Sequence, residues 1–269
     1  MSANNMRFFV IGIFAAMVLA SVLFDRGWKP AAPARDSICT AQLLDTNHFA
    51  TTTIITMNTS RAYALAARMN GYVTVVQGSS FKDSRCKPQR HREGCTLAHL
   101  GVLRRIADST AKTRWHLVLE DDAVPSEELV CTPWWAKEIV RVALGAEAIN
   151  LGPSHPYPAY GELFRHPFTM LKQYMEYAVA PAGKVVMRGW NAWAHAYMIK
   201  PSAAARVIAY VHPRMCENHW DVIMGHGARW DPDMQFVARV YDKAAHYPLG
   251  TWRNYGVFGQ SDDHLSLTK

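Results

Sequence analysis

Two β-branched runs in the first third of the chain flank a stretch with helical spacing. Thr51–Asn58 (TTTIITMN) and Tyr72–Gly78 (YVTVVQG) have the apolar, β-branched composition of buried strands. Between them, Arg61–Met69 has the spacing of a helix, and the polar residues 58–60 are suited to cap its first turn. A strand, a helix and a second strand in this order predict a βαβ unit and a parallel sheet.

The alternation of helix-like and strand-like patterns continues through the middle of the chain. Gly94–Asp108 places four apolar side chains at threefold spacing, which predicts a helix with one apolar face: Leu97, Leu100, Leu103 and Ile106. Trp115–Glu120 (WHLVLE) predicts the next strand, which ends in the acidic triplet Glu120, Asp121 and Asp122.

Further elements follow in the second half. Helices are expected at Pro133–Ala143 and Pro201–Val211, each starting at or near its proline, and strands at Ala146–Gly152 and Asn191–Lys200. The stretch 153–167 and the tail from Pro248 onward have no clear period and are expected to be irregular. The pattern as a whole predicts an α/β domain with a mostly parallel central sheet.

The N-terminal region has a different composition. Residues 8–24 are uncharged and apolar, and a helix of that length spans about 26 Å, enough for a thin bilayer. We expect a short tail at 1–7, a membrane signal-anchor at 8–24, a proline- and alanine-containing stem at 25–50 and one globular domain at 51–269. This layout is that of a single-pass type II membrane protein, and a cleaved signal peptide is the alternative.

Charge and cysteine content narrow the functional classes. The 269-residue chain has a formal charge of +7, and a basic segment at 82–92 is either a solvated loop or a loop that contacts phosphates. No nucleic-acid-binding motif is present, so nucleic acid is not an expected partner. None of the five cysteines forms a CxxC pair, which argues against a zinc site; in an oxidising compartment up to two disulfides could form, Cys86 with Cys95 being one possible pair.

The acidic triplet is the strongest chemical feature of the sequence. Residues two apart in a strand share a face, so Glu120 and Asp122 are expected on one side and Asp121 on the other. Carboxylate oxygens suit Mn²⁺ or Mg²⁺, and such an ion can neutralise the diphosphate of a nucleotide-sugar. A solvated acidic turn is the alternative interpretation of so short a motif.

The surroundings of the triplet resemble those of a known family. Gly94, Cys95 and His99, followed by a hydrophobic strand that ends in Glu-Asp-Asp, are similar to the signature of glycosyltransferase family 25. The stretches IITMNTSRAYALAARM, AWAHAYMIKPSAAARVI, HWDVIMG and GQSDDH resemble further motifs of that family, in the same order. Ala98 departs from the family pattern, which has Ser before the histidine, and Thr59-Ser60 follow Asn58 in place of Leu-Asp.

The resemblance implies a GT-A-like nucleotide-sugar-binding α/β sandwich and a set of site residues. Glu120 and Asp122 would hold the metal, with His246 as a further ligand. Four residues would contact the bound nucleotide-sugar or its metal: Asn58, Arg61, His99 and Asp121. His195 is, like His99, a candidate for such a contact, and a structural role is the alternative for both.

A transfer with inversion needs a carboxylate base near the acceptor hydroxyl. Asp221 is the expected base and Glu217 the reserve, although capping of the following helix would equally explain Asp221. Asp231-Pro232-Asp233 repeats the pattern of two acidic residues separated by one position, but its proline predicts a turn.

The expected function is a metal-dependent transfer of a hexose, galactose or glucose, from a UDP-sugar to a glycan or protein acceptor. The catalytic domain would lie in the Golgi or endoplasmic reticulum lumen of a eukaryotic host. A non-catalytic glycan- or protein-binding module on a degenerate glycosyltransferase fold is the alternative, and another metal-dependent phosphate enzyme, such as a phosphodiesterase, is a third possibility.

Overall fold

The computed structural model describes residues 43–78, 86, 90–153, 177, 183–190, 195–243, 245, 251–252 and 256–261. The chain divides into two compact units, 1–40 and 41–269, and all the described residues belong to the second. The expected membrane span at 8–24 lies outside the described residues. Within the described part of the chain, no helix combines the length and apolar character that a bilayer crossing requires.

The folded domain begins before Thr51, the boundary expected from the sequence. Strand β1 (Leu44–Asp45) pairs in parallel with β3 (Met69–Asn70), and the Leu44 and Phe49 side chains are buried in the core. Residues 43–50 are therefore part of the domain and not of the stem, because a two-residue strand pairing and two buried apolar side chains fix them to it.

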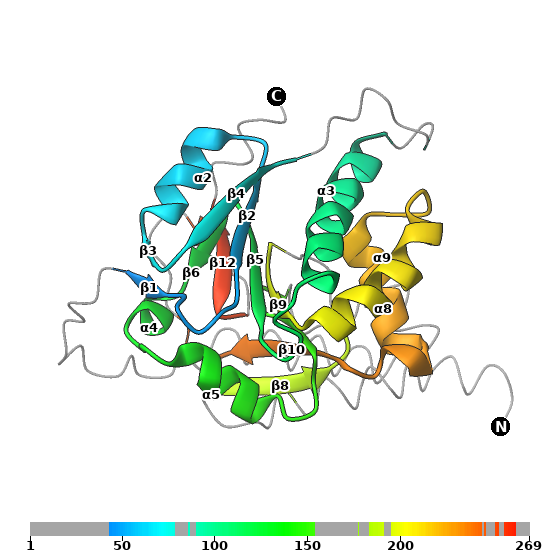
Figure 1. Cartoon of the computed structure of the whole chain (residues 1–269). Coiled ribbons are helices and arrows are strands. Elements are labelled where there is room, and N and C mark those ends of the chain that lie inside the picture. The colour runs from blue at the N-terminus through cyan, green and yellow to red at the C-terminus, as the bar shows by residue number, and fades with distance from the viewer. Residues whose placement is uncertain are drawn as a thin grey trace, which may run out of the picture. The chain divides into compact units, whose positions relative to one another are not determined.

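A seven-stranded mixed sheet forms the centre of the domain, in the order β4-β2-β5-β9-β7-β10-β8 (Figure 1). Strands β4, β2, β5, β7 and β10 run in one direction, and β9 and β8 run in the other. Their bounds are β2 Thr52–Thr56, β4 Val73–Gln77, β5 His116–Glu120, β7 Ala148–Asn150, β8 Lys184–Arg188, β9 Ala196–Ile199 and β10 Val237–Asp242. The predicted α/β class with its βαβ opening is confirmed.

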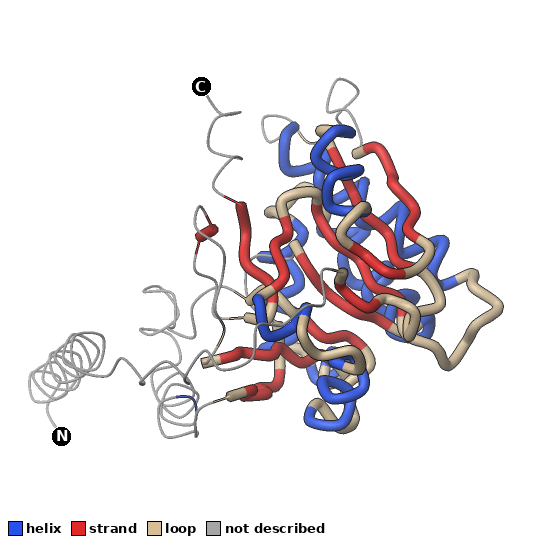
Figure 2. The backbone as a smooth tube through the Cα atoms, turned by 90° about the vertical axis from the view of Figure 1, so that its left-hand side faces the viewer, coloured by secondary structure: helices blue, strands red, loops and turns tan. Residues whose placement is uncertain are grey.

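Helices cover both faces of this sheet (Figures 1 and 2). One face carries α3 (Arg90–Ala107), α8 (Pro201–Val211) and α9 (Trp220–Trp230), and the other carries α2 (Thr59–Ala66), α4 (Glu127–Val130) and α5 (Trp135–Val142). The strand residues divide between the two cores by alternation: Val118 packs with α3, α8 and α9, whereas Leu117 and Leu119 pack with α2, α4 and α5. Two short 3₁₀ turns, His212–Arg214 and Pro232–Met234, flank α9.

The expected helices and strands are present, with several differences. Strands β8 and β10 were not expected, and helix α2 ends at Ala66, before the expected Met69. Helix α5 begins at Trp135 and not at the expected proline. The tail is not irregular, because β11 (Thr251–Trp252) and β12 (Phe258–Ser261) form a second, three-stranded sheet with β6 (Ala123–Pro125). Strands this short carry little periodicity of their own and exist because distant segments pair with them. Of the stretch expected to be irregular at 153–167, only Pro153 lies among the described residues.

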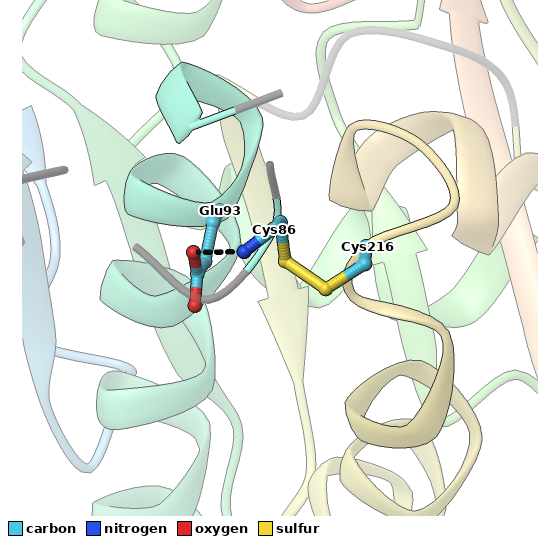
Figure 3. The surroundings of a disulfide bond; sticks show 3 residues. All are labelled: Cys86, Glu93 and Cys216. Atoms are coloured by element: carbon cyan, nitrogen blue, oxygen red, sulfur yellow. Dashed lines mark hydrogen bonds between the residues drawn. A yellow bond between two sulfur atoms is a disulfide. The ribbon is translucent and has the colours of Figure 1, made fainter. Parts of the chain in front are cut away.

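The cysteine pairing differs from the pair suggested by proximity in the sequence. Cys86 is bonded to Cys216, which precedes α9, and its backbone N–H donates to Glu93 of α3 at 3.0 Å (Figure 3). Cys131 is also disulfide-bonded, and Cys95 is a free thiol on α3. The suggested Cys86–Cys95 bond is therefore wrong. The disulfide joins Cys86, shortly before α3, to the turn before α9, instead of closing a local loop.

Candidate functional site

The acidic triplet lies at the carboxyl end of β5, in the middle of the sheet. Strand β2 is the parallel neighbour of β5 on one side and ends at the same edge. The chain leaving β2 leads to β4 on one side, whereas the chain leaving β5 leads to strands on the other side. The carboxyl ends of β2 and β5 therefore form a topological switch point, the place where open α/β sheets bind ligands.

Asp121 faces α2 and holds the junction between β2 and this helix. Its carboxylate accepts hydrogen bonds from the Thr56 hydroxyl and from the Asn58 backbone N–H at 3.1 Å, and it lies 3.5 Å from Arg61 Nη2. The Asn58 side chain caps α2 by accepting from the Arg61 backbone N–H at 3.3 Å. The structure thus brings Asn58, Arg61 and Asp121 together as one hydrogen-bonded group.

Glu120 points to the opposite face, as the strand alternation predicts, and contacts α3. Its Oε1 lies 3.0 Å from Nε2 of His99. The other ring nitrogen of His99 lies 3.1 Å from the Tyr197 hydroxyl of β9, and the His99 ring stacks on Trp220 with centroids 4.4 Å apart. His99 is fully buried, so β9, α9 and α3 together fix the orientation of the side chain that contacts Glu120.

Asp122 is the least compensated of the three acids. One carboxylate oxygen accepts a hydrogen bond from Gln260 Nε2 of β12 at 2.7 Å. The other oxygen, Oδ1, is buried and has no hydrogen-bond partner among the described residues. Burial, and then the nearby charge of Glu120, raise the pKa of Asp122 to about 6, against the opposing hydrogen bond from Gln260. At neutral pH, Oδ1 is therefore a charged acceptor without a hydrogen-bond donor from the described part of the chain, and a bound cation would compensate its charge.

The residues expected to act as base have different positions. Asp221 lies in the first turn of α9, not at its cap, and its side chain accepts from the backbone N–H of Val222 at 2.8 Å. Its negative charge adds to burial in raising the pKa of Cys95 and opposes the lowering of the His195 pKa by burial, which places Asp221 near the acidic triplet. Glu217 is exposed in the turn before α9, and its charge contributes to raising the pKa of Tyr210 of α8, after the larger effect of burial.

Of the two remaining sequence-predicted residues, His246 lies outside the described residues, so its expected role as a metal ligand stays a prediction. His195 is buried at the start of β9, where its ring is 3.4 Å from the Phe258 carbonyl and burial lowers its pKa. Its backbone carbonyl accepts from the Glu120 N–H at 2.7 Å. A Cβ added at Gly152 would come within 2.1 Å of the His195 ring, so this histidine is tightly packed.

Several residues of the site were not chosen from the sequence. Gln260 reaches Asp122 from a tail that was expected to be irregular, and Tyr197 and Trp220 position His99 from distant segments. Cys95 could have been assigned to the site from the sequence, because it precedes His99 by four residues and so lies on the same face of a helix. The thiol of Cys95, Nε2 of His99 and a carboxylate oxygen of Glu120 all lie within 4.8 Å of one another.

Comparison with known proteins adds no further constraint on the function: no protein family model matches the chain, and no curated protein matches its sequence.

Proposed function

We propose that this protein is a metal-dependent glycosyltransferase of the GT-A type, which moves a hexose, galactose or glucose, from a UDP-sugar to a glycan or protein acceptor. The proposal combines the resemblance of the sequence to glycosyltransferase family 25 with the position of the acids at the switch point of the sheet. The observation that carries it is the buried Oδ1 of Asp122, which has no hydrogen-bond partner among the described residues and lies close to Glu120.

The donor set fits a hard divalent cation. Asp122 and Glu120 offer carboxylate oxygens, the ligands that Mn²⁺ and Mg²⁺ prefer. When bound, such an ion would neutralise the negative charge that develops on the departing nucleoside diphosphate. Asp121 is a poorer ligand, because three groups of β2 and α2 already contact its carboxylate. We therefore assign Asp121 to positioning Arg61 and the start of α2.

The neighbouring residues supply binding and proton transfer in this proposal. Arg61 lies 3.5 Å from Asp121 and would contact a phosphate oxygen of the donor, while Asn58 fixes the backbone of the turn that carries it. Asp221 would accept the proton of the acceptor hydroxyl, because its charge already reaches the groups beside Glu120. The disulfides Cys86–Cys216 and that of Cys131 are consistent with an oxidising compartment, such as the proposed lumenal location.

The test is a nucleotide-sugar screen that measures released UDP, with Mn²⁺, with Mg²⁺ and in EDTA. We expect turnover of one UDP-hexose that requires the metal and is lost in Asp122→Asn, which keeps the shape of the side chain and its contact with Gln260. Asp108→Asn, the same substitution at an exposed position directly after α3, is the matched control and should retain activity. A chain that binds no UDP and releases none with any metal contradicts the proposal.

One observation favours the alternative of a non-catalytic binding module. Glu120 and Asp121 already have partners within the protein, His99 for the first and Thr56, Asn58 and Arg61 for the second. A degenerate fold would keep these contacts for stability alone. Glycan or protein binding that survives in Asp122→Asn, without UDP release by the wild type, would support this alternative.

A further inference from the structure

Cys95 differs from the other described cysteines. Cys86, Cys131 and Cys216 are disulfide-bonded, whereas Cys95 is a free, partly exposed thiol on α3. It lies one helical turn before His99, and its sulfur, the His99 Nε2 and a Glu120 oxygen lie within 4.8 Å of one another. A thiol, an imidazole and a carboxylate are thus brought to one point by two elements, α3 and β5.

We propose that Cys95, His99 and Glu120 form a binding site for a thiophilic divalent cation such as Zn²⁺, and that this cation excludes one held by Glu120 and Asp122. The two sites share Glu120, so they cannot be filled independently. Binding at the thiol site does not depend on the proposed function, whereas the consequence, inhibition by zinc of a Mn²⁺-dependent reaction, rests on it.

The ligand set selects the class of metal. Sulfur and imidazole ligands with one carboxylate are typical of Zn²⁺ sites, and three protein ligands leave a fourth position for water. Mn²⁺ and Mg²⁺ prefer oxygen ligands and would favour the pair of carboxylates instead. Formation of the sulfur–metal bond releases the Cys95 thiol proton to solvent.

The second ligand is already oriented for this role. The His99 ring is stacked on Trp220 and fully buried, so its position is fixed. With a cation on Nε2, the proton of the neutral ring is on Nδ1 and donates to the Tyr197 hydroxyl oxygen, which lies 3.1 Å away. The cation replaces the present contact between Nε2 and Glu120, which then binds the same ion.

The electrostatic surroundings also favour a cation. The charges of Glu120, Asp221 and Asp122 act on Cys95, and together with burial, the largest cause, they raise the pKa of its thiol. A divalent cation gains from the same three carboxylates that disfavour the thiolate alone.

Co²⁺ is a suitable spectroscopic probe, used on the full chain without a histidine tag and without reductant. One equivalent of Co²⁺ should produce a thiolate-to-cobalt charge-transfer band, which Zn²⁺ removes by displacement and Mn²⁺ does not. Cys95→Ser should abolish the band, while His212→Ala, which removes an exposed histidine next to α8, should leave it unchanged. Tyr197→Phe should weaken binding by about 10- to 100-fold because it removes the partner of Nδ1.

A second readout requires no variant. Zn²⁺ should protect Cys95 from alkylation by iodoacetamide, measured by mass spectrometry of the intact chain. Absence of a charge-transfer band, a band that persists in Cys95→Ser, or alkylation that Zn²⁺ does not slow would each overturn the site.

The exclusion is measured separately by electron paramagnetic resonance of Mn²⁺. Bound Mn²⁺ should be released as Zn²⁺ is added, and bound Mn²⁺ that persists at saturating Zn²⁺ overturns the exclusion. If the chain binds no Mn²⁺ at all but still gives the cobalt band, the thiol site is supported and the metal of the proposed glycosyl transfer is contradicted.

Discussion

Three consecutive carboxylates at the end of β5 have three different surroundings. Glu120 contacts a buried histidine, Asp121 is held by donors from β2 and α2, and Asp122 retains a buried oxygen without a hydrogen-bond partner among the described residues. Burial of a negative charge is therefore unfavourable at Asp122, as its raised pKa indicates. The residue proposed to bind a cation is therefore also expected to destabilise the metal-free fold when it is ionised.

The raised pKa of Asp122 gives a stability prediction for the metal-free protein. A group whose folded pKa lies above its unfolded value contributes stability below the unfolded pKa, and this is lost as pH rises through about 6. At pH 8 in EDTA, Asp122→Asn should be more stable than the wild type by about 3 kcal/mol, with the difference disappearing near pH 4. Denaturant unfolding at both pH values measures it.

The same variant should lose metal-dependent UDP release, so that stability and activity change in opposite directions. A stability difference that is equal at pH 4 and pH 8 would show that ionised Asp122 is not the source of the effect.

His116, at the start of β5, is predicted to have the opposite pH dependence. Burial, and then the charge of Arg114, lower its pKa, and its Nδ1 lies 2.8 Å from the Thr51 hydroxyl. A histidine with a lowered folded pKa contributes stability above its unfolded pKa of about 6.5, and this is lost as pH falls through the folded value. The wild type should therefore lose more stability between pH 7 and pH 5 than His116→Asn, in which the amide keeps a polar atom near the position of Nδ1.

Thermal unfolding at several pH values measures this difference, and His212→Ala, an exposed site, serves as the control. Parallel pH profiles for the wild type and His116→Asn would contradict the prediction.

At the scale of elements, the acidic site depends on the packing of the tail. Gly256 leads into β12, and the backbone N–H groups of Val257 and Phe258 both donate to the Leu151 carbonyl. A Cβ added at Gly256 would lie 2.2 Å from that carbonyl oxygen. The approach of the tail to the end of β7 therefore requires a residue without a side chain.

Gly256→Ala should destabilise the domain by about 1 to 3 kcal/mol, because backbone atoms on both sides would have to move apart. Gly101→Ala is the matched control: it lies within α3 with open space around it, so the substitution should stabilise the domain by about 0.5 to 1 kcal/mol. Denaturant midpoints compare the two variants. A neutral effect at Gly256 would mean that β12 is not closely packed on this carbonyl.

The elements that the sequence predicts well are those whose pattern is local. Strands β2 and β5 and helices α3 and α8 carry long apolar runs or one apolar face, and each was expected close to its observed bounds. The tail strands could not be expected in this way, because β12 is held by pairing with a distant segment. In the site, strand alternation predicted the opposite faces of Glu120 and Asp121, whereas Asp122 lies in the turn after β5. The contacts of Gln260 and Tyr197 depend on tertiary packing.

At the scale of the whole domain, one covalent link joins distant parts of the chain. The Cys86–Cys216 disulfide spans 130 residues and connects the approach to α3 with the turn before α9. Cross-linking so long a loop reduces the entropy of the unfolded chain, and removal of such a bond costs about 2 to 5 kcal/mol.

The double variant Cys86→Ala and Cys216→Ala should lose that amount in guanidinium unfolding without reductant. The variant is preferable to a reducing agent because Cys131 is disulfide-bonded too. Cys95→Ser is the control for a cysteine without a disulfide and should change stability much less. Equal stability of the double variant and the wild type would contradict the expected role of the bond.

The contact between Gln260 and Asp122 has a consequence for the order in which the protein is made. β5 and β2 leave the ribosome early, but β9, which pairs with β5, follows about 80 residues later, and β12 is translated later still. A nascent chain therefore carries Asp122 for about half of its synthesis without the Gln260 amide that donates to it. On the proposed function, the cation site at this edge would be complete only after β12 has emerged, so we expect chains that end before residue 256 to bind no cation there, even when most of their sheet has formed.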